Sequence, residues 1–342
     1  MLDLYRNLRP LLFTLPPEAA HAATLTGLKL AHHFGLLPVV EKPASAPVSL
    51  MGLQFPNRLG LAAGLDKNAV CIDALGALGF GFIEVGTVTP KPQRGNPRPR
   101  LFRLIDDRAL INRMSFPNDG IARVCARLAK RQYGTSMSGI CGINIGKNAG
   151  TPLQEAASDY IAGLAAAYPF ADYIAINISS PNTLELRRLQ QGELLQSLLA
   201  ALQETRIVLT RELGRHIPML VKLTADLDDV ELADAARVSV ACGVDGIIAT
   251  NTTVSREEIK YRGKEEGGLS GAPLLKRALH AVQCIRAEAG ARFPIIGVGG
   301  IDSVADAEAM RTAGADLMQV YTGLIYRGPE LIREILASAV SA

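Results

Sequence analysis

Short apolar segments alternate with longer amphipathic stretches along the chain from residue 53 onward. The apolar segments are rich in β-branched residues, as buried parallel strands are, and the longer stretches have the apolar spacing of helices. The pattern predicts strands at 59–63, 82–85, 140–144, 173–176, 219–222, 246–249, 295–298 and 317–320. It predicts helices at 71–78, 193–213, 230–242, 274–288 and 304–312.

Eight strands that alternate with helices predict an α/β fold, a parallel (β/α)8 or TIM barrel, with a doubly wound sheet as the alternative. The interval between the second and third strands is long. It holds two further apolar segments, 101–105 and 109–111, joined by a turn at Asp106-Asp107. These segments predict an inserted β-hairpin over the mouth of the barrel.

Residues 1–40 follow a different pattern and predict a small helical extension. A second helix is expected over about 18–34, after a first one whose apolar face carries Leu4, Leu8, Leu11 and Leu12. Two such helices either pack on the main domain or lie in a membrane interface. Prolines at 38, 43 and 47 then indicate a linker. We therefore divide the chain into an extension, residues 1–40, and a barrel domain, residues 41–342.

Composition narrows the class of protein. Apolar residues make up 48% of the 342 residues and charged residues 20%, which supplies a sizeable core. The 36 basic residues nearly balance the 33 acidic ones, so nucleic-acid binding is not expected. The chain lacks an apolar run of about 18 residues, so no membrane span is predicted. Its first residues have neither a secretory nor a transit-peptide layout.

The cysteines are scattered and odd in number, at 71, 125, 141, 242 and 284. They form no CxxC pair and no cluster with histidine along the sequence. The spacing therefore predicts reduced thiols in a reducing compartment, and no metal site.

Polar residues follow six of the predicted strands, where catalytic groups collect in such barrels. Any one of them has an ordinary explanation as a cap or turn residue. The six strand ends together predict a shared ligand. In chain order they carry Gly64 with Lys67, Thr87, Asn144, Asn177, Lys222, and Thr250-Asn251-Thr252.

The turn at 177–183, Asn-Ile-Ser-Ser-Pro-Asn-Thr, is the most unusual of these strand ends. It gathers amides and adjacent hydroxyls, whereas a plain helix cap needs only one such residue. Pro181 restricts Ser180 to extended backbone geometry, which holds that hydroxyl out from the chain. Ser180 is therefore a candidate functional residue.

Glycines follow the last two predicted strands. Gly299-Gly300 and Gly323 let backbone N–H groups approach an anion, and these two loops are the usual phosphate site of a TIM barrel. Gly271 lies in a third loop that would complete the cradle. Flavin mononucleotide (FMN) has both a phosphate and a ring with amide-like edges, so it fits this set of residues. Lys222 would stabilise negative charge on its reduced ring.

Short motifs follow one another in a fixed order along nearly the whole chain: AAGLDKN at 62–68, GTVTPKPQ at 86–93, GNPRPRLFRL at 95–104, INRMSF at 111–116, NIGKN at 144–148, NISSPNT at 177–183, VKLTAD at 221–226, TNTT at 250–253, GGLSG at 267–271, GVGGI at 297–301 and YTGL at 321–324. The set resembles the dihydroorotate dehydrogenase family. Ser180 matches the catalytic serine of its quinone-dependent class, where another class has a cysteine. Residues 1–40 are similar to the helical extension of that class, which meets the membrane and guides a quinone to the flavin, and the short version here resembles the bacterial form.

The resemblance implies an activity and a set of site residues. The protein would oxidise dihydroorotate to orotate in pyrimidine biosynthesis, transfer a hydride to FMN and return the electrons to a membrane quinone, with Ser180 as general base. The implied FMN contacts are Ala63, Gly64, Lys67, Thr87, Asn144, Asn177, Lys222, Thr250, Gly271, Gly300, Tyr321 and Thr322. The implied substrate contacts are Lys67, Asn112, Arg113, Met114, Ser115, Phe116, Asn177, Asn182, Asn251 and Thr252.

Further roles follow for residues around this site. A serine hydroxyl is a poor base, so Thr183 and a water are the candidate proton relay. By resemblance, His21 and Arg103 would line the path of the quinone. The enzyme is expected on the cytoplasmic face of the cell (inner) membrane, held peripherally through residues 1–40. No metal, nucleic acid or obligate partner subunit is expected.

The chain departs from the family pattern at two places. Ser115 stands where the family usually has glycine, and Leu184-Glu185 follow Thr183 where the family often has Pro-Gly. Two alternatives remain open. One is another FMN-dependent barrel oxidoreductase acting on a pyrimidine-like ring, such as a dihydrouridine synthase, which would need a cysteine acid near its substrate. The other is a flavin-free phosphate-binding barrel, an isomerase or an aldolase.

Overall fold

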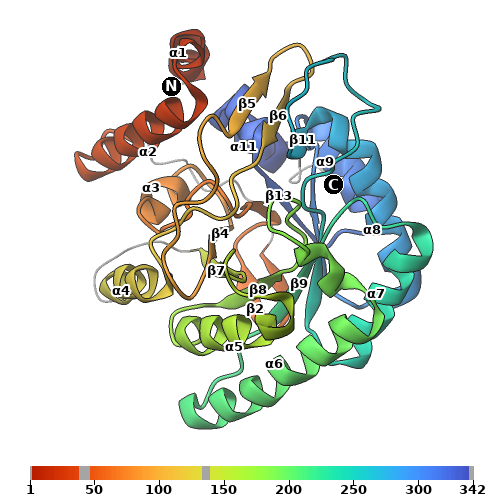
Figure 1. Ribbon diagram of the computed structural model, residues 1–342. Coiled ribbons are helices and arrows are strands. Elements are labelled where there is room, and N and C mark those ends of the chain that lie inside the picture. The colour runs from red at the N-terminus through yellow and green to blue at the C-terminus, as the bar shows by residue number, and fades with distance from the viewer. Residues whose placement is uncertain (1, 38–46, 133–138, 339–342) are drawn as a thin grey trace.

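A closed barrel of eight parallel strands forms the centre of the protein (Figure 1). The computed structural model describes residues 2–37, 47–132 and 139–338. The sheet closes between β13 and β3, where Met318 pairs with Leu59, so the predicted TIM barrel is confirmed and the open doubly wound sheet is excluded. The barrel strands are β3 (Leu59–Leu61), β4 (Phe82–Val88), β7 (Ile140–Ile145), β8 (Tyr173–Asn177), β9 (Met219–Leu223), β10 (Gly246–Ala249), β12 (Ile295–Val298) and β13 (Leu317–Val320).

Helices surround the barrel and bury its outer face. The expected helices at 193–213, 230–242, 274–288 and 304–312 are present, each to within one residue at either end, and the one expected at 71–78 is shorter. The described residues also contain the α-helices α4, α5, α10 and α11, for which the sequence analysis gave no bounds. The helices around the barrel are α3 (Ile72–Gly76), α4 (Ile121–Gln132), α5 (Ala156–Ala167), α6 (Gly192–Leu213), α7 (Asp229–Ala241), α8 (Leu275–Ala289), α9 (Val304–Thr312), α10 (Thr322–Arg327) and α11 (Pro329–Ser338).

The predicted inserted hairpin is present as β5 (Leu101–Leu104) and β6 (Ala109–Asn112), which pair antiparallel. A third strand, β11 (Gly268–Gly271), joins the hairpin by pairing antiparallel with β6. The sequence had placed this glycine-rich segment in a loop. Its pairing ties the hairpin to the loop after β10, so that the small sheet lies beside the carboxyl ends of the barrel strands.

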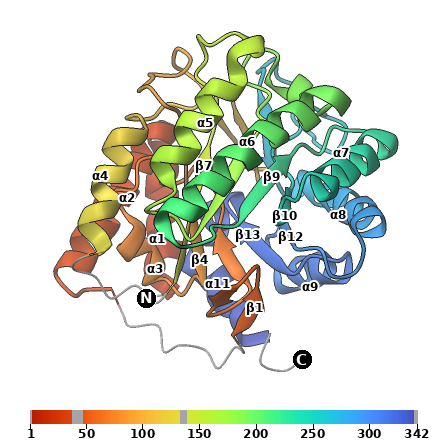
Figure 2. The same ribbon diagram turned by 90° about the horizontal axis from the view of Figure 1, so that it is seen from below.

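A second small hairpin, which was not predicted, lies at the other end of the barrel. It consists of β1 (Val48–Leu50) and β2 (Leu53–Phe55), and Figure 2 shows β1 at that end. Phe55 is fully buried and its ring meets the Phe82 ring edge to face, with centroids 5.3 Å apart. The hairpin therefore closes the amino-terminal end of the barrel with an aromatic plug.

Both expected helices of the extension are present, as α1 (Leu2–Thr14) and α2 (Pro17–His33), and they stand beside β5 and β6 (Figure 1). Arg9 donates to the carbonyl of Tyr326 at 2.6 Å, and Glu18 forms an ion pair with Arg100 at 2.9 Å. The expected boundary at residue 40 and the prolines at 38 and 43 lie outside the described residues, so the division into two domains stays a prediction. Among the described residues, no helix has the length and apolar character needed to cross a membrane.

Inside the barrel, Gly142 on β7 makes room for Tyr173 on β8, because a Cβ at position 142 would overlap the tyrosine ring. We expect Gly142→Ala to lower the free energy of unfolding by about 1–3 kcal/mol, the usual cost of overpacking a core. Urea unfolding followed by circular dichroism measures the change. Gly150→Ala is the matched control, since an added Cβ there meets nothing within 4 Å. Equal stability of the two variants would contradict this account of the barrel interior.

Candidate active site

A cavity of about 1090 Å³ opens at the carboxyl ends of the barrel strands, beneath β5, β6 and β11. The polar strand ends that were predicted to share a ligand meet here. Those that line the cavity are Gly64, Lys67, Thr87, Asn177, Lys222, Thr250, Asn251 and Thr252.

The floor of the cavity rests on a buried carboxylate, Glu84 on β4, which the sequence analysis did not single out. Its Oε1 accepts a hydrogen bond from Asn144 Nδ2 at 2.7 Å. Its Oε2 accepts bonds from the Tyr173 hydroxyl at 2.9 Å and from Gln319 Nε2 at 2.8 Å. Burial and this carboxylate raise the pKa of Tyr173, so its hydroxyl stays a donor. A buried carboxylate is tolerated only with such partners. The presence of a Glu inside the apolar segment 82–85 could have indicated this site from the sequence.

Two groups on this floor are left for a ligand. The Lys222 ammonium lies 3.8 Å from Glu84 Oε1, and it makes no hydrogen bond with any residue that the structure describes. Gln319 Oε1 is also buried without a partner among those residues. Both side chains lie beside the Glu84 carboxylate, and a donor and an acceptor left over there match a ring edge that both accepts and donates hydrogen bonds, as the isoalloxazine edge does.

Four asparagines on the cavity wall are joined in two pairs. Asn251 Nδ2 donates to Asn177 Oδ1 at 3.3 Å, and Asn182 Nδ2 donates to Asn112 Oδ1 at 3.1 Å. The Ser179 hydroxyl strengthens the first pair by accepting from Asn251 at 2.9 Å. These amides can read both donors and acceptors of a small polar ring.

Ser180 lines the same cavity and is only 5% exposed. Its Oγ accepts the backbone N–H of Asn182 at 3.3 Å. Thr183 does not line the cavity. It is buried behind the turn, with its Oγ1 3.4 Å from the Ser115 hydroxyl. The Ser180 hydroxyl thus faces the cavity, whereas the Thr183 hydroxyl, three residues further along the chain, does not.

The two departures from the family pattern have visible consequences. Ser115 has φ 55° and Phe116 has φ 51°, both in the left-handed region that glycine favours, and the Ser115 hydroxyl takes up the contact with Thr183. After Glu185, the chain forms a short 3₁₀ helix at Leu186–Gln190. Arg187 in that helix donates to the Ser179 carbonyl at 3.1 Å and to the Asp226 carboxylate at 2.7 Å. The turn at 177–183 is therefore tied to the loop after β9.

Three glycine loops converge at one side of the cavity. A Cβ at Gly271 would overlap the backbone of Arg108, one at Gly300 the backbone of Leu275, and one at Gly323 the backbone of Ile301, so only glycine fits at these three positions. Ser270 Oγ and Thr322 Oγ1 lie 2.8 Å apart at the same place. Glycine-rich loops whose backbone N–H groups can approach an anion are common phosphate sites, so this side of the cavity is the candidate phosphate site.

Lys67 supplies the second ammonium of the cavity. Its Nζ donates to the Gly64 carbonyl at 2.5 Å, and the Tyr321 hydroxyl donates to the same oxygen at 3.3 Å. Burial and the nearby Arg100 guanidinium lower the pKa of Lys67 to about 8. Burial raises the pKa of Tyr321 to about 12, so its hydroxyl keeps its proton.

Two of the expected contact residues do not line the cavity. Asn144 lies behind the wall, between Glu84 and Asn177. Arg113 turns outward and donates to the Pro99 carbonyl at 2.9 and 3.1 Å. All five cysteines are free thiols in the described part of the chain, and none of them lines this cavity, so the cysteine acid required by a dihydrouridine synthase has no candidate.

A second cavity, about 880 Å³ and mostly apolar, lies under α1 and α2. His21 and Arg103 both line it. The His21 Nε2 lies 2.7 Å from the Leu65 carbonyl and must donate to it, while burial lowers the pKa of this imidazole and favours its neutral form. Arg103 donates to the carbonyls of Phe13 and Leu15. The two cavities share walls at Leu101, Leu110 and Tyr321.

Comparison with known proteins agrees with this geometry. The family model described as dihydroorotate dehydrogenase matches residues 45–340. The chain is 52% identical to the dihydroorotate dehydrogenase (quinone) of Chromobacterium violaceum, over 97% of this chain and 96% of that protein. It is 52% identical to the protein of the same name from Leptothrix cholodnii, over 96% of each. The crystal structure of the Eimeria tenella enzyme in complex with ferulenol superposes with a TM-score of 0.87 at 39% identity, covering 94% of this chain and 89% of that one.

The matches span nearly the whole chain, so they include both the barrel and the helical extension. The chain therefore belongs to the flavin-dependent dihydroorotate dehydrogenase family, and within it to the quinone-dependent class that oxidises dihydroorotate in pyrimidine biosynthesis.

Proposed function

We propose that the enzyme binds FMN and dihydroorotate in the polar cavity and receives a membrane quinone in the apolar cavity under α1 and α2. The observation that carries this proposal is the shared wall of the two cavities at Leu101, Leu110 and Tyr321. A flavin accepts a hydride from the substrate and gives up electrons to a quinone, so it needs polar access on one side and apolar access on the other.

The residues present fit FMN. The glycine loops at 271, 300 and 323 supply a cradle for one phosphate, and Lys222 with Gln319 supplies a donor and an acceptor for the ring edge. The ammonium of Lys222 stabilises negative charge on that edge. Asn144 acts from behind the wall by orienting Asn177, whose amide nitrogen donates to Asn144 Oδ1 at 3.3 Å.

Dihydroorotate is a cyclic ureide with a carboxylate. The paired amides of Asn112 with Asn182 and of Asn177 with Asn251 are placed to read its ring edge, and Lys67 is placed to pair with its charge. Ser180 removes the proton from C5. A serine hydroxyl already carries a proton at neutral pH and cannot hold a second one, so its own proton must leave as it accepts the proton from C5, and we assign Thr183 with a water to this step.

We expect Ser180→Ala to slow the loss of flavin absorbance after dihydroorotate is mixed with the enzyme. The expected factor is about 10²–10⁴, which is the usual contribution of a positioned general base. Anaerobic stopped flow measures this rate. The bound flavin and the affinity for orotate should be retained, because Ser180 contributes one hydroxyl to the cavity wall. A rate within a factor of two or so of the wild-type rate would remove Ser180 from this role.

The lowered pKa of Lys67 predicts a pH dependence of substrate binding. As the pH rises through about 8, Lys67 loses its proton, its attraction for the substrate carboxylate falls, and the KM for dihydroorotate rises. Steady-state kinetics across this range test the prediction. Lys67→Arg should move the rise to higher pH, since a guanidinium keeps its charge. A KM that rises equally in both proteins would assign the titration to another group.

Membrane contact through the extension is supported by its exposed apolar side chains. Leu11, Phe34 and Leu36 are 65%, 67% and 71% exposed. Exposed apolar groups of this kind mark surfaces for membranes or partners. The enzyme then rests peripherally on the cytoplasmic face of the cell membrane, where the apolar cavity takes quinone directly from the lipid.

Thr24 on α2 lines the apolar cavity, whereas Thr26 on the same helix is exposed. Thr24→Trp should fill the cavity and raise the KM for a soluble quinone by about tenfold or more, while dihydroorotate still bleaches the flavin at the wild-type rate. Thr26→Trp is the matched control and should behave as wild type in both assays. Normal quinone kinetics in Thr24→Trp would refute this path for the quinone.

The function as a whole is tested by anaerobic addition of dihydroorotate to the purified enzyme. The yellow colour should fade, and a quinone should restore it. A colourless preparation would instead favour the flavin-free barrel.

A further inference from the structure

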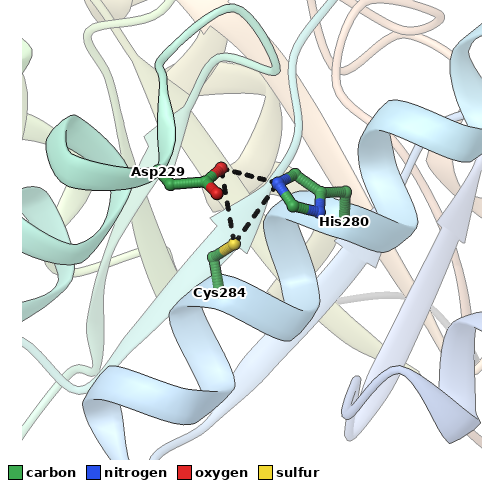
Figure 3. A group of neighbouring side chains, drawn as sticks. All are labelled: Asp229, His280 and Cys284. Atoms are coloured by element: carbon green, nitrogen blue, oxygen red, sulfur yellow. Dashed lines mark hydrogen bonds and ion pairs between the residues drawn. The ribbon is translucent and has the colours of Figure 1, made fainter.

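Three side chains with metal-binding atoms gather on the outer layer of helices, away from both cavities. Asp229 begins α7, and His280 and Cys284 lie one turn apart on the same face of α8 (Figure 3). The sequence analysis predicted no metal site, because it found no CxxC pair and no clustering of cysteine with histidine. It did not take into account that His280 and Cys284 are four residues apart, which places them on one helix face. The packing of α7 beside α8 brings Asp229 to the other two residues.

The spacing of the donor atoms is close to that of a metal site. Cys284 Sγ lies 3.5 Å from His280 Nε2 and 3.8 Å from Asp229 Oδ1. In a tetrahedral zinc site with bonds of about 2.0–2.3 Å, neighbouring donors are about 3.3–3.6 Å apart. The third pair, His280 Nε2 and Asp229 Oδ1, is closer at 2.6 Å because it is hydrogen-bonded. A small rotation of the exposed Asp229 carboxylate opens that pair.

The backbone around the cluster holds these donors in place. Asp228 caps α7 and forms a capping box with Glu231, which fixes the helix end that carries Asp229. His280 and Cys284 stand in the interior of a fifteen-residue helix. Sites built on helices keep their geometry better than sites on loops.

We propose that Asp229, His280 and Cys284 form a binding site for a divalent transition metal of the zinc type, with water in the fourth position. Imidazole and thiolate select zinc over magnesium or calcium, which prefer oxygen ligands. Binding forms bonds from the metal to Sγ, Nε2 and a carboxylate oxygen. The thiol proton passes to solvent. The imidazole, whose Nε2 donates to Asp229 in the empty site, must carry its single proton on Nδ1 when Nε2 binds the metal.

Such a metal would cross-link the start of α7 to the middle of α8. The loop before α7 follows β9, which carries Lys222, and the segment before α8 carries Gly271. The cross-link therefore joins the helix that follows β9 to the helix that follows the Gly271 segment, and both β9 and that segment contribute to the polar cavity. It adds stability in proportion to metal occupancy, since the metal binds the folded chain and not the unfolded one.

The chain offers a matched comparison for the histidine and for the cysteine. His216 pairs with Asp245 at 3.1 Å and is 50% exposed, against 55% for His280, and no thiol accompanies that pair within hydrogen-bonding distance among the described residues. Cys242 is the other half-buried thiol and lies at the far end of α7. His216→Ala and Cys242→Ser therefore remove a similar side chain without touching the cluster.

The test uses the intact enzyme with its flavin bound and its cysteines kept as free thiols. The enzyme is first treated with a chelator and then dialysed against Zn²⁺. We expect about one equivalent of zinc per wild-type chain by elemental analysis, and its loss in His280→Ala and in Cys284→Ala. The two controls should keep it. Zinc should also slow alkylation of Cys284 by about tenfold or more in the wild-type protein, since a metal-bound thiolate is protected. Unchanged flavin absorbance in all variants confirms that they fold.

Two results would overturn the proposal. One is the absence of bound zinc in the wild-type enzyme together with unchanged alkylation of Cys284. The other is an equivalent of zinc that persists in both cluster variants, which would place the metal at another site, for example on the exposed histidines His32 and His33.

Discussion

The carboxylate of Glu84, buried inside the barrel, is the constraint on which the active site depends. A charge in that position requires hydrogen-bond donors on neighbouring strands, and Asn144, Tyr173 and Gln319 provide them. Tyr173 in turn requires a glycine opposite it on β7. The same carboxylate holds Lys222 at 3.8 Å without saturating its donors. The floor of the cavity is thereby rigid and still presents a cation to a ligand.

Above this floor, the structure holds two cavities of different polarity. The strand ends and the turn at 177–183 provide a polar chamber, while the extension and the hairpin β5–β6 enclose an apolar one. The walls common to both come from the hairpin and from Tyr321. The hairpin is held by the pairing of β6 with β11. It is also held by the ion pair between Glu18 on α2 and Arg100, which directly precedes β5. An insertion between two barrel strands therefore forms most of the wall between the two cavities.

Much of this arrangement could be predicted from local sequence. The barrel strands are buried on both faces and so appear as continuous apolar segments, and the polar residues after them mark the strand ends. Features set by distant contacts were missed. The strands β1 and β2 are three residues each, β11 contains two glycines, and the alanine-rich α5 has little polar contrast between its faces. The outward turn of Arg113 and the burial of Thr183 depend on neighbours from other loops, as does the meeting of Asp229 with α8.

The most direct test of the central claim is a crystal structure of the enzyme with its cofactor and orotate. This account predicts FMN with its phosphate among Gly271, Gly300 and Thr322, and its ring edge within hydrogen-bonding distance of Lys222 and Gln319. The Ser180 hydroxyl should lie about 3–3.5 Å from C5 of orotate, on the face opposite the flavin. A flavin bound elsewhere, or a Ser180 hydroxyl directed away from the pyrimidine in the closed complex, would contradict it.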